Sequence, residues 1–183
     1  MRFAKLINPF SAEGPGRALY VRIVTQARQP EFYRHCGVPD TLDGRFEMLA
    51  LHMFLVLRRL KDEDAAALSQ ELLDTLFADM DENLREMGVG DLSVGRRVKQ
   101  MADAFYGRIA AYEDGLNGEA GVLEASLARN LFGTVEAPPA ALRALAAYLQ
   151  REAGSLAALD MKAVCAGEVA FGPPPKVEEG QKG

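Results

Sequence analysis

The chain has 183 residues, of which 49% are apolar, so it can bury one substantial core and we expect a single domain. Its 21 Lys and Arg residues against 26 Asp and Glu residues give a net charge of −5, which argues against binding DNA or an anionic membrane over the whole surface. The two cysteines are far apart and belong to no CxxC pair, which is typical of free thiols in a reducing compartment.

The charges are unevenly distributed along the chain. Residues 1–60 carry nine basic and five acidic side chains, whereas residues 61–91 carry two basic and ten acidic ones. This pattern has two interpretations: a solvated acidic helix face, or a basic N-terminal third that contacts the ribosome or a membrane surface.

Helical periodicity runs through almost the whole chain, and no segment shows the alternation of a strand. Residues 1–16 are expected to form an N-terminal arm, which lacks the continuous apolar core of a secretory signal. The pattern then predicts an amphipathic helix at 17–28, a short helix at 31–35 and a central helix over 41–60. Asp40, Thr41 and Asp43 are the candidate N-caps of the central helix.

The central helix is apolar on every side from Met48 to Leu57, so we expect it to be buried in the core. The apolar run is shorter than the about 20 residues that span a bilayer. His52 lies within the run, and a hydrogen-bonded core residue is favoured over a functional one. Phe54 lies on the stripe that should face water, so either another helix covers it or it belongs to an exposed contact patch.

The second half predicts four or five more helices. One follows the acidic run 62–64 and ends at Met87, a longer one begins with Ser93 as its N-cap, and shorter helices follow at 119–132, from Pro138 and, more weakly, at 156–164. The expected fold is therefore an all-α, single-domain bundle of about six to eight helices. Its helical domain covers 17–165, and a disordered, flexible C-terminal tail covers 166–183, since the part from Gly172 is too rich in Pro, Gly and charge to pack.

No set of residues indicates catalysis or a metal. Asp79-x-Asp81-x-Asn83 resembles the start of a calcium loop, but Leu84 stands where that loop needs glycine. No serine lies in the sharp strand-to-helix turn of a nucleophile motif. His35 and Cys36 are adjacent, but no second His or Cys lies near enough in the sequence to complete a zinc site. We therefore expect no catalytic, metal or cofactor residues and a protein that is not an enzyme.

Two segments resemble a known family. The first is YRHCGVPDTLDGRFE at 33–47, leading into the apolar run that ends LRRL at 57–60; the second comprises LREMGVGD at 84–91 and VKQMADAFYGRIAAY at 98–112. In this order they resemble the ubiquinol-cytochrome c chaperone family, over about residues 17–150. The resemblance implies an assembly factor of the cytochrome bc1 complex that binds newly made cytochrome b. The short N-terminus indicates a bacterial member, in the cytoplasm or peripheral at the inner membrane.

The family context suggests which residues contact a partner. We expect polar groups of the two segments to fix the loops that present a client surface, and the exposed stripe of the central helix to contribute to it; these candidates are Arg45, Phe54, Arg58, Asp91, Tyr106 and Arg108. Two alternatives remain open. One is a helical protein that binds haem or another cofactor through His52, and the other is a ribosome-contacting scaffold that uses the basic residues Arg17, Arg22, Arg28 and Arg34.

Overall fold

The computed structural model describes residues 14–61, 65–133 and 135–177. These residues form eight helices and no strand: α1 (Pro15–Ala27), α2 (Pro30–Arg34), α3 (Leu42–Arg59), α4 (Ala66–Glu86), α5 (Asp91–Asn117), α6 (Val122–Leu131), α7 (Pro139–Ala157) and α8 (Met161–Cys165). The all-α prediction and the expected number of helices are confirmed. None of the described helices is long and apolar enough to cross a bilayer.

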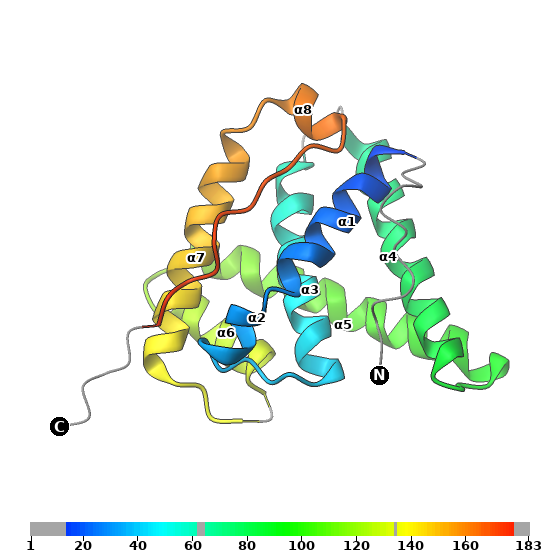
Figure 1. Cartoon of the computed structure of the whole chain (residues 1–183), viewed down its shortest axis with the longest axis horizontal. Coiled ribbons are helices and arrows are strands. Elements are labelled where there is room, and N and C mark those ends of the chain that lie inside the picture. Colours follow the sequence, from blue (N-terminus) through cyan, green and yellow to red (C-terminus); the bar gives the residue numbers. More distant parts are fainter. Residues whose placement is uncertain (1–13, 62–64, 134, 178–183) are drawn as a thin grey trace.

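Helix α3 is the centre of the fold. It contacts α1, α5, α6 and α7, which surround it in Figure 1. Of the nine residues from Met48 to Val56, all but Leu49 are buried, as its apolar sequence predicted. Thr41 caps the helix, because its side-chain oxygen accepts a hydrogen bond from the Gly44 amide at 3.1 Å. This cap was one of the three expected from the sequence.

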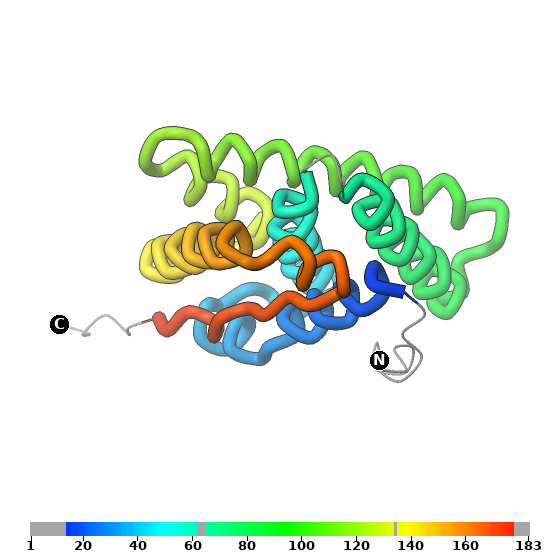
Figure 2. Tube along the Cα trace, turned by 90° about the horizontal axis from the view of Figure 1, so that it is seen from above, coloured from blue at the N-terminus to red at the C-terminus, as the bar shows by residue number. Residues whose placement is uncertain are grey.

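Helix α5 is the longest element and runs along one edge of the molecule (Figure 2). It begins at Asp91, with Gly90 as its N-cap, so the prediction that Ser93 is the cap is wrong. Asp91 in the first turn favours the earlier start, because its negative charge lies at the positive end of the helix dipole. The first half of α5 packs against α4, and the turn at Gly88, with a φ of 80°, joins the two helices.

The segment 166–177, which we call the C-terminal strap, runs back along α7 and α1 without regular structure (Figures 1 and 2). Val169 and Pro175 are buried in it. The amide of Gly172 donates to Glu152 at 2.8 Å, and the carbonyl of Gly172 accepts from Gln26 at 2.9 Å. Flexibility from residue 166 onward was therefore the wrong expectation for the strap. Residues 178–183 of the predicted tail, and 1–13 of the predicted arm, lie outside the described residues.

Candidate functional site

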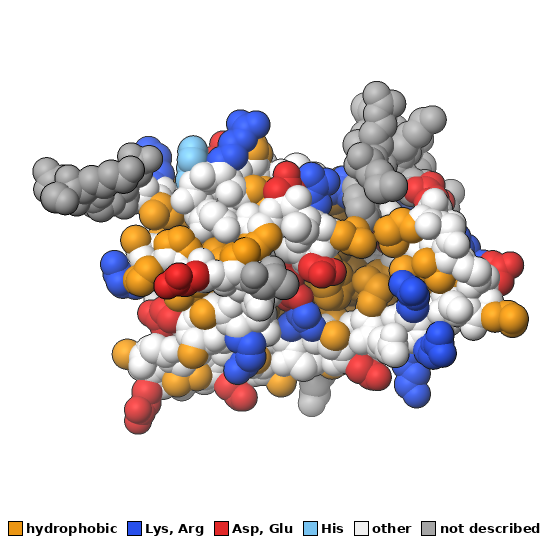
Figure 3. All heavy atoms as spheres, turned by 90° about the horizontal axis from the view of Figure 1, so that it is seen from below, with side chains coloured by type: hydrophobic (Ala, Val, Ile, Leu, Met, Phe, Trp, Pro, Cys, Tyr) orange, Lys and Arg blue, Asp and Glu red, His pale blue; other side chains and the backbone are white. Residues whose placement is uncertain are grey.

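A large groove opens between α1, the start of α3, the end of α4, the part of α5 up to Arg108 and the end of α6. Its volume is about 1280 Å³. The face shown in Figure 3 is hollowed, with hydrophobic side chains inside the hollow and charged ones around it. Since typical small-molecule pockets measure about 300–1,000 Å³, this groove can receive something larger than a small metabolite.

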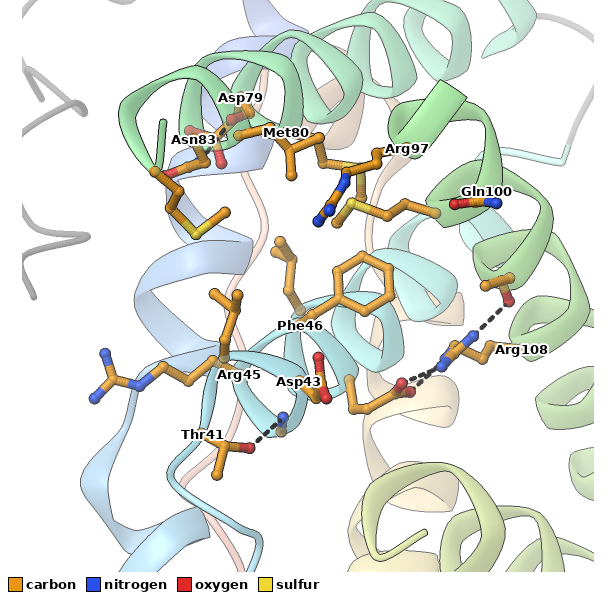
Figure 4. Close-up of a pocket in the computed structure, with 18 of the residues that line it drawn as sticks. Thr41, Asp43, Arg45, Phe46, Asp79, Met80, Asn83, Arg97, Gln100 and Arg108 are labelled. Carbon is orange, nitrogen blue, oxygen red and sulfur yellow. Dashed lines mark hydrogen bonds and ion pairs between the residues drawn. The ribbon is translucent and has the colours of Figure 1, made fainter. Parts of the chain in front are cut away.

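One wall of the groove is largely apolar, although Arg28, Asp79 and Asn83 also line it. It is formed by α1 and α4, from which Val24, Met80 and Leu84 are buried and Met87 is exposed. Phe46 of α3 lies across the cavity from Met80 in the close-up of Figure 4. Methionine and phenylalanine side chains of this kind make an adaptable surface for an apolar segment.

The opposite wall, on α5, is largely polar, with Met101 and Ala104 as its apolar members. Ser93, Arg97, Gln100, Ala104 and Arg108 follow one another at steps of four, three, four and four, so they lie on one face of the helix, and all of them line the groove. Figure 4 shows the Arg97 side chain directed into the cavity.

Arg108 is fixed by its neighbours. Its guanidinium forms a two-pronged ion pair with the carboxylate of Glu47 and also donates to the carbonyl of Ala104 at 2.8 Å (Figure 4). Glu47 is buried, and this burial raises the pKa of its carboxyl group although Arg108 opposes the shift. The ion pair joins the two sequence segments that resemble the family, since Glu47 belongs to the first and Arg108 to the second.

The back of the groove holds a second polar contact. The hydroxyl of Tyr20 donates to the carboxylate of Asp79 at 2.8 Å, which ties α1 to α4. Burial, and then the negative charge of Asp79, raise the pKa of Tyr20. Tyr20 therefore stays protonated and serves as a hydrogen-bond donor.

The structure brings two of the predicted partner-binding residues to the groove. Arg45 lines it and forms an exposed ion pair with Asp40 at 2.6 Å, which lowers the pKa of the Asp40 carboxyl group. Arg108 lines it as described above. Asp91 and Tyr106 are exposed on α5 but do not line the groove, and Asp91 pairs with Arg85.

The two candidates on the central helix lie elsewhere. Phe54 is 1% exposed and packs against Tyr112 of α5, with ring centroids 5.7 Å apart. The alternative of an exposed patch at Phe54 is therefore wrong, because α5 covers this face of α3. Arg58 is half-buried and forms an ion pair with Glu113 at 3.3 Å, beside a small pocket of about 200 Å³.

His52 is a fully buried core residue, as the favoured interpretation predicted. Its Nδ1 donates to the carbonyl of Met48 at 2.8 Å, so its Nε2 accepts from the hydroxyl of Tyr148 at 2.8 Å. Gln26 donates in turn to that hydroxyl at 3.0 Å. Since both ring nitrogens are engaged and neither reaches a pocket, the geometry does not suit an axial haem ligand.

Sequence reasoning missed several residues of the groove, including Glu47, Arg97 and Gln100. Arg97 lies outside the apolar stripe of α5, on a side of the helix where a sequence pattern predicts an ordinary solvated arginine. Only the packing of α4 against α5 shows that this face borders a cavity. Within the ranges that the structure covers, no group of three His, Cys, Asp or Glu side chains could hold a metal ion.

The geometry can be compared with known proteins. A family model described as ubiquinol-cytochrome C chaperone matches residues 34–171. The chain is similar to the crystal structure of the Cbp3 homolog from Brucella abortus, with a TM-score of 0.78, 40% sequence identity, and coverage of 87% of this chain and 89% of that one.

Two vertebrate relatives carry the same name, ubiquinol-cytochrome c reductase complex assembly factor 1. The Xenopus laevis protein is 27% identical over 158 residues, which cover 85% of this chain and 79% of the relative. The human protein is 24% identical over 163 residues, which cover 82% of this chain and 54% of the relative. The chain thus spans most of the frog protein but about half the length of the human one.

Proposed function

The chain belongs to the ubiquinol-cytochrome c chaperone family, and from this we propose that it is an assembly factor of the ubiquinol-cytochrome c reductase, or cytochrome bc1, complex that binds newly made cytochrome b in its groove. The names of its relatives support the role in assembly. The groove is the observation that supports a binding role, since it offers an apolar wall to an unassembled segment.

The size of the groove suits a helical segment. An α-helix with its side chains is about 10 Å wide, so a cavity of about 1280 Å³ holds a cylinder about 16 Å long, or about three turns. Helix-in-groove recognition places the apolar face of such a segment against a hydrophobic wall. The wall formed by α1 and α4 provides that surface, and the bound segment is protected from aggregation before its partners arrive.

Filling the groove tests this function. Gln100 is exposed and lines the groove, so Gln100→Trp should block it without disturbing the core. Gln150 is exposed on α7 outside the groove, so Gln150→Trp is the matched control. In cells that make the bc1 complex but lack this gene, wild type and Gln150→Trp should restore cytochrome b, measured by reduced-minus-oxidised spectra. Gln100→Trp should leave it at the level of the deletion.

The same strains allow a direct binding measurement. Tagged wild type and the Gln150→Trp control should recover unassembled cytochrome b on affinity purification, and Gln100→Trp should not. Recovery of no cytochrome b by the wild-type protein would contradict the proposed client. Full complementation by Gln100→Trp would show that the groove is not where the client binds.

A contact with the ribosome or a membrane surface is a second part of the proposal, and it rests on the basic N-terminal third. Arg34 is exposed on α2, and Arg22 is exposed although it donates to the carbonyl of Val169 at 3.2 Å. Arg28 instead lines the groove. Co-sedimentation with ribosomes that falls steeply with salt would support the contact, because exposed charges are screened. A cytoplasmic protein, peripheral at the inner membrane, fits this role.

A further inference from the structure

We propose that the groove selects an amphipathic helical segment whose polar face carries a carboxylate, and that Arg97 binds this carboxylate. The inference rests on the proposed function, because it specifies the chemistry of the segment that the groove receives. It follows from the difference between the two walls and from the charges that line them.

The walls differ in what they can bind. The wall from α1 and α4 offers methionine, leucine and valine side chains, which gain by covering apolar atoms. The wall from α5 offers hydrogen-bond donors, namely the hydroxyl of Ser93, the guanidinium of Arg97 and the amide of Gln100. A segment that is apolar all round would leave these donors without water or partners. A helix with one apolar and one polar face satisfies both walls.

The charges favour an acidic group on that polar face. Six arginines line the groove against three acidic residues, Asp43, Glu47 and Asp79. Two of these acids already have partners, because Glu47 is paired with Arg108 and Asp79 accepts from Tyr20. The lining therefore has an excess of positive charge, and a carboxylate complements it.

Arg97 is the arginine to which we assign the carboxylate, because it reaches into the cavity. It forms no ion pair with any residue that the structure describes, and its side chain projects into the cavity opposite Phe46 (Figure 4). By contrast, Arg108 is held by Glu47, and Arg45 is held by Asp40. A guanidinium can donate to both oxygens of a carboxylate in a two-pronged contact, which fixes the position of the bound helix along the groove.

Binding of model helices tests the inference. Three fluorescein-labelled peptides of about 18 residues, long enough to form a helix, share a Leu and Ala face and differ only in a central Glu, Gln or Lys on the polar face. By fluorescence anisotropy, the wild-type chain should bind the Glu peptide about fivefold more tightly than the Gln peptide, as expected for a partly exposed ion pair. High salt should reduce this preference.

Two substitutions assign the preference to Arg97. Arg97→Gln should bind the Glu and Gln peptides equally, and Arg97→Glu should prefer the Lys peptide. Arg143, which is exposed on α7 outside the groove, provides the control Arg143→Gln, which should keep the wild-type preference. Equal binding of all three peptides by the wild type, or an unchanged preference in Arg97→Gln, would overturn the inference.

Peptide binding by the wild type and by Gln100→Trp together separates failure of the carboxylate inference from failure of the groove as the client site. If the wild type binds all three peptides equally and Gln100→Trp abolishes that binding, the groove receives apolar helices and only the carboxylate inference fails. If no peptide binds, or if Gln100→Trp binds as well as the wild type, both the inference and the groove as client site fail. Displacement of the Glu peptide by anionic lipid vesicles, dependent on Arg97, would show that the guanidinium serves a phosphate instead.

Discussion

His52 illustrates how a single buried residue links stability to pH. The ring has no exposed surface, and burial lowers its pKa from 6.5 to about 4, against the opposing effect of the hydrogen bond to Met48. The folded protein therefore holds His52 neutral at neutral pH. Between pH 6.5 and pH 4 the unfolded chain binds a proton at this residue that the folded chain does not. Stability contributed by His52 is complete above this window and is lost as the pH falls through it.

We predict that replacing His52 removes a measurable part of the acid sensitivity. Between pH 7 and pH 5, the wild type should lose about 2 kcal/mol more of its unfolding free energy than His52→Gln does, because only the wild type must exclude this proton. The measurement is urea unfolding at both pH values. The His52→Gln protein will also be less stable at pH 7, since it loses the hydrogen bond to Tyr148. The prediction is therefore tested by the change of the unfolding free energy with pH, not by its value at one pH. Equal slopes would show that His52 does not titrate on unfolding.

At the level of elements, the sequence predicted what depends on local pattern and missed what depends on contacts between distant segments. The burial of α3 follows from an apolar sequence on all sides, and the Thr41 cap follows from local hydrogen bonding. The strap did not follow, because its proline and glycine residues resemble those of a disordered tail. Its order comes from the buried acceptor Glu152 and from Gln26, which lie 20 and 146 residues away from Gly172.

We predict that the strap contributes to the stability of the whole domain. A chain that ends after Val169 loses the ring of Phe171, which packs edge-on against His52 at 5.3 Å, and the two hydrogen bonds of Gly172. Its unfolding free energy should fall by about 3 kcal/mol, from lost apolar burial and because Glu152 loses the Gly172 donor and keeps only Arg151 as a partner. A chain that ends after Val177 keeps every contact of the strap and is the control. Equal stability of the two truncated chains in urea would contradict the prediction.

For the molecule as a whole, the two segments that predicted the family meet at the groove, although most of the groove residues were not predictable. Two acidic side chains of α4 are also less solvated than the charge pattern suggested. Glu71 accepts from the Gly16 amide at 3.0 Å, and Asp79 accepts from Tyr20, so α4 uses these acids to hold α1. The residues that face the cavity could not be predicted from the sequence, because the cavity exists only where five helices, α1, α3, α4, α5 and α6, leave a space between them.

Glu47 and Arg108 are 61 residues apart in the sequence, and their ion pair joins α3 to α5. We expect this pair to stabilise the whole molecule. Arg108→Met leaves the buried Glu47 carboxylate unpaired, and we expect it to lower the unfolding free energy by about 3 kcal/mol. Replacing both residues by Met should recover most of that loss, because no buried charge remains.

Arg45→Met, which breaks the exposed pair with Asp40, is the matched control and should change stability by less than about 1 kcal/mol. Urea unfolding of the two single variants, the double variant and the control provides the comparison. The deficit of Arg108→Met should shrink as the pH falls, because Glu47, whose pKa is already raised by burial, then takes up a proton and loses its charge. A double variant as unstable as Arg108→Met would show that the side chains matter through packing rather than charge.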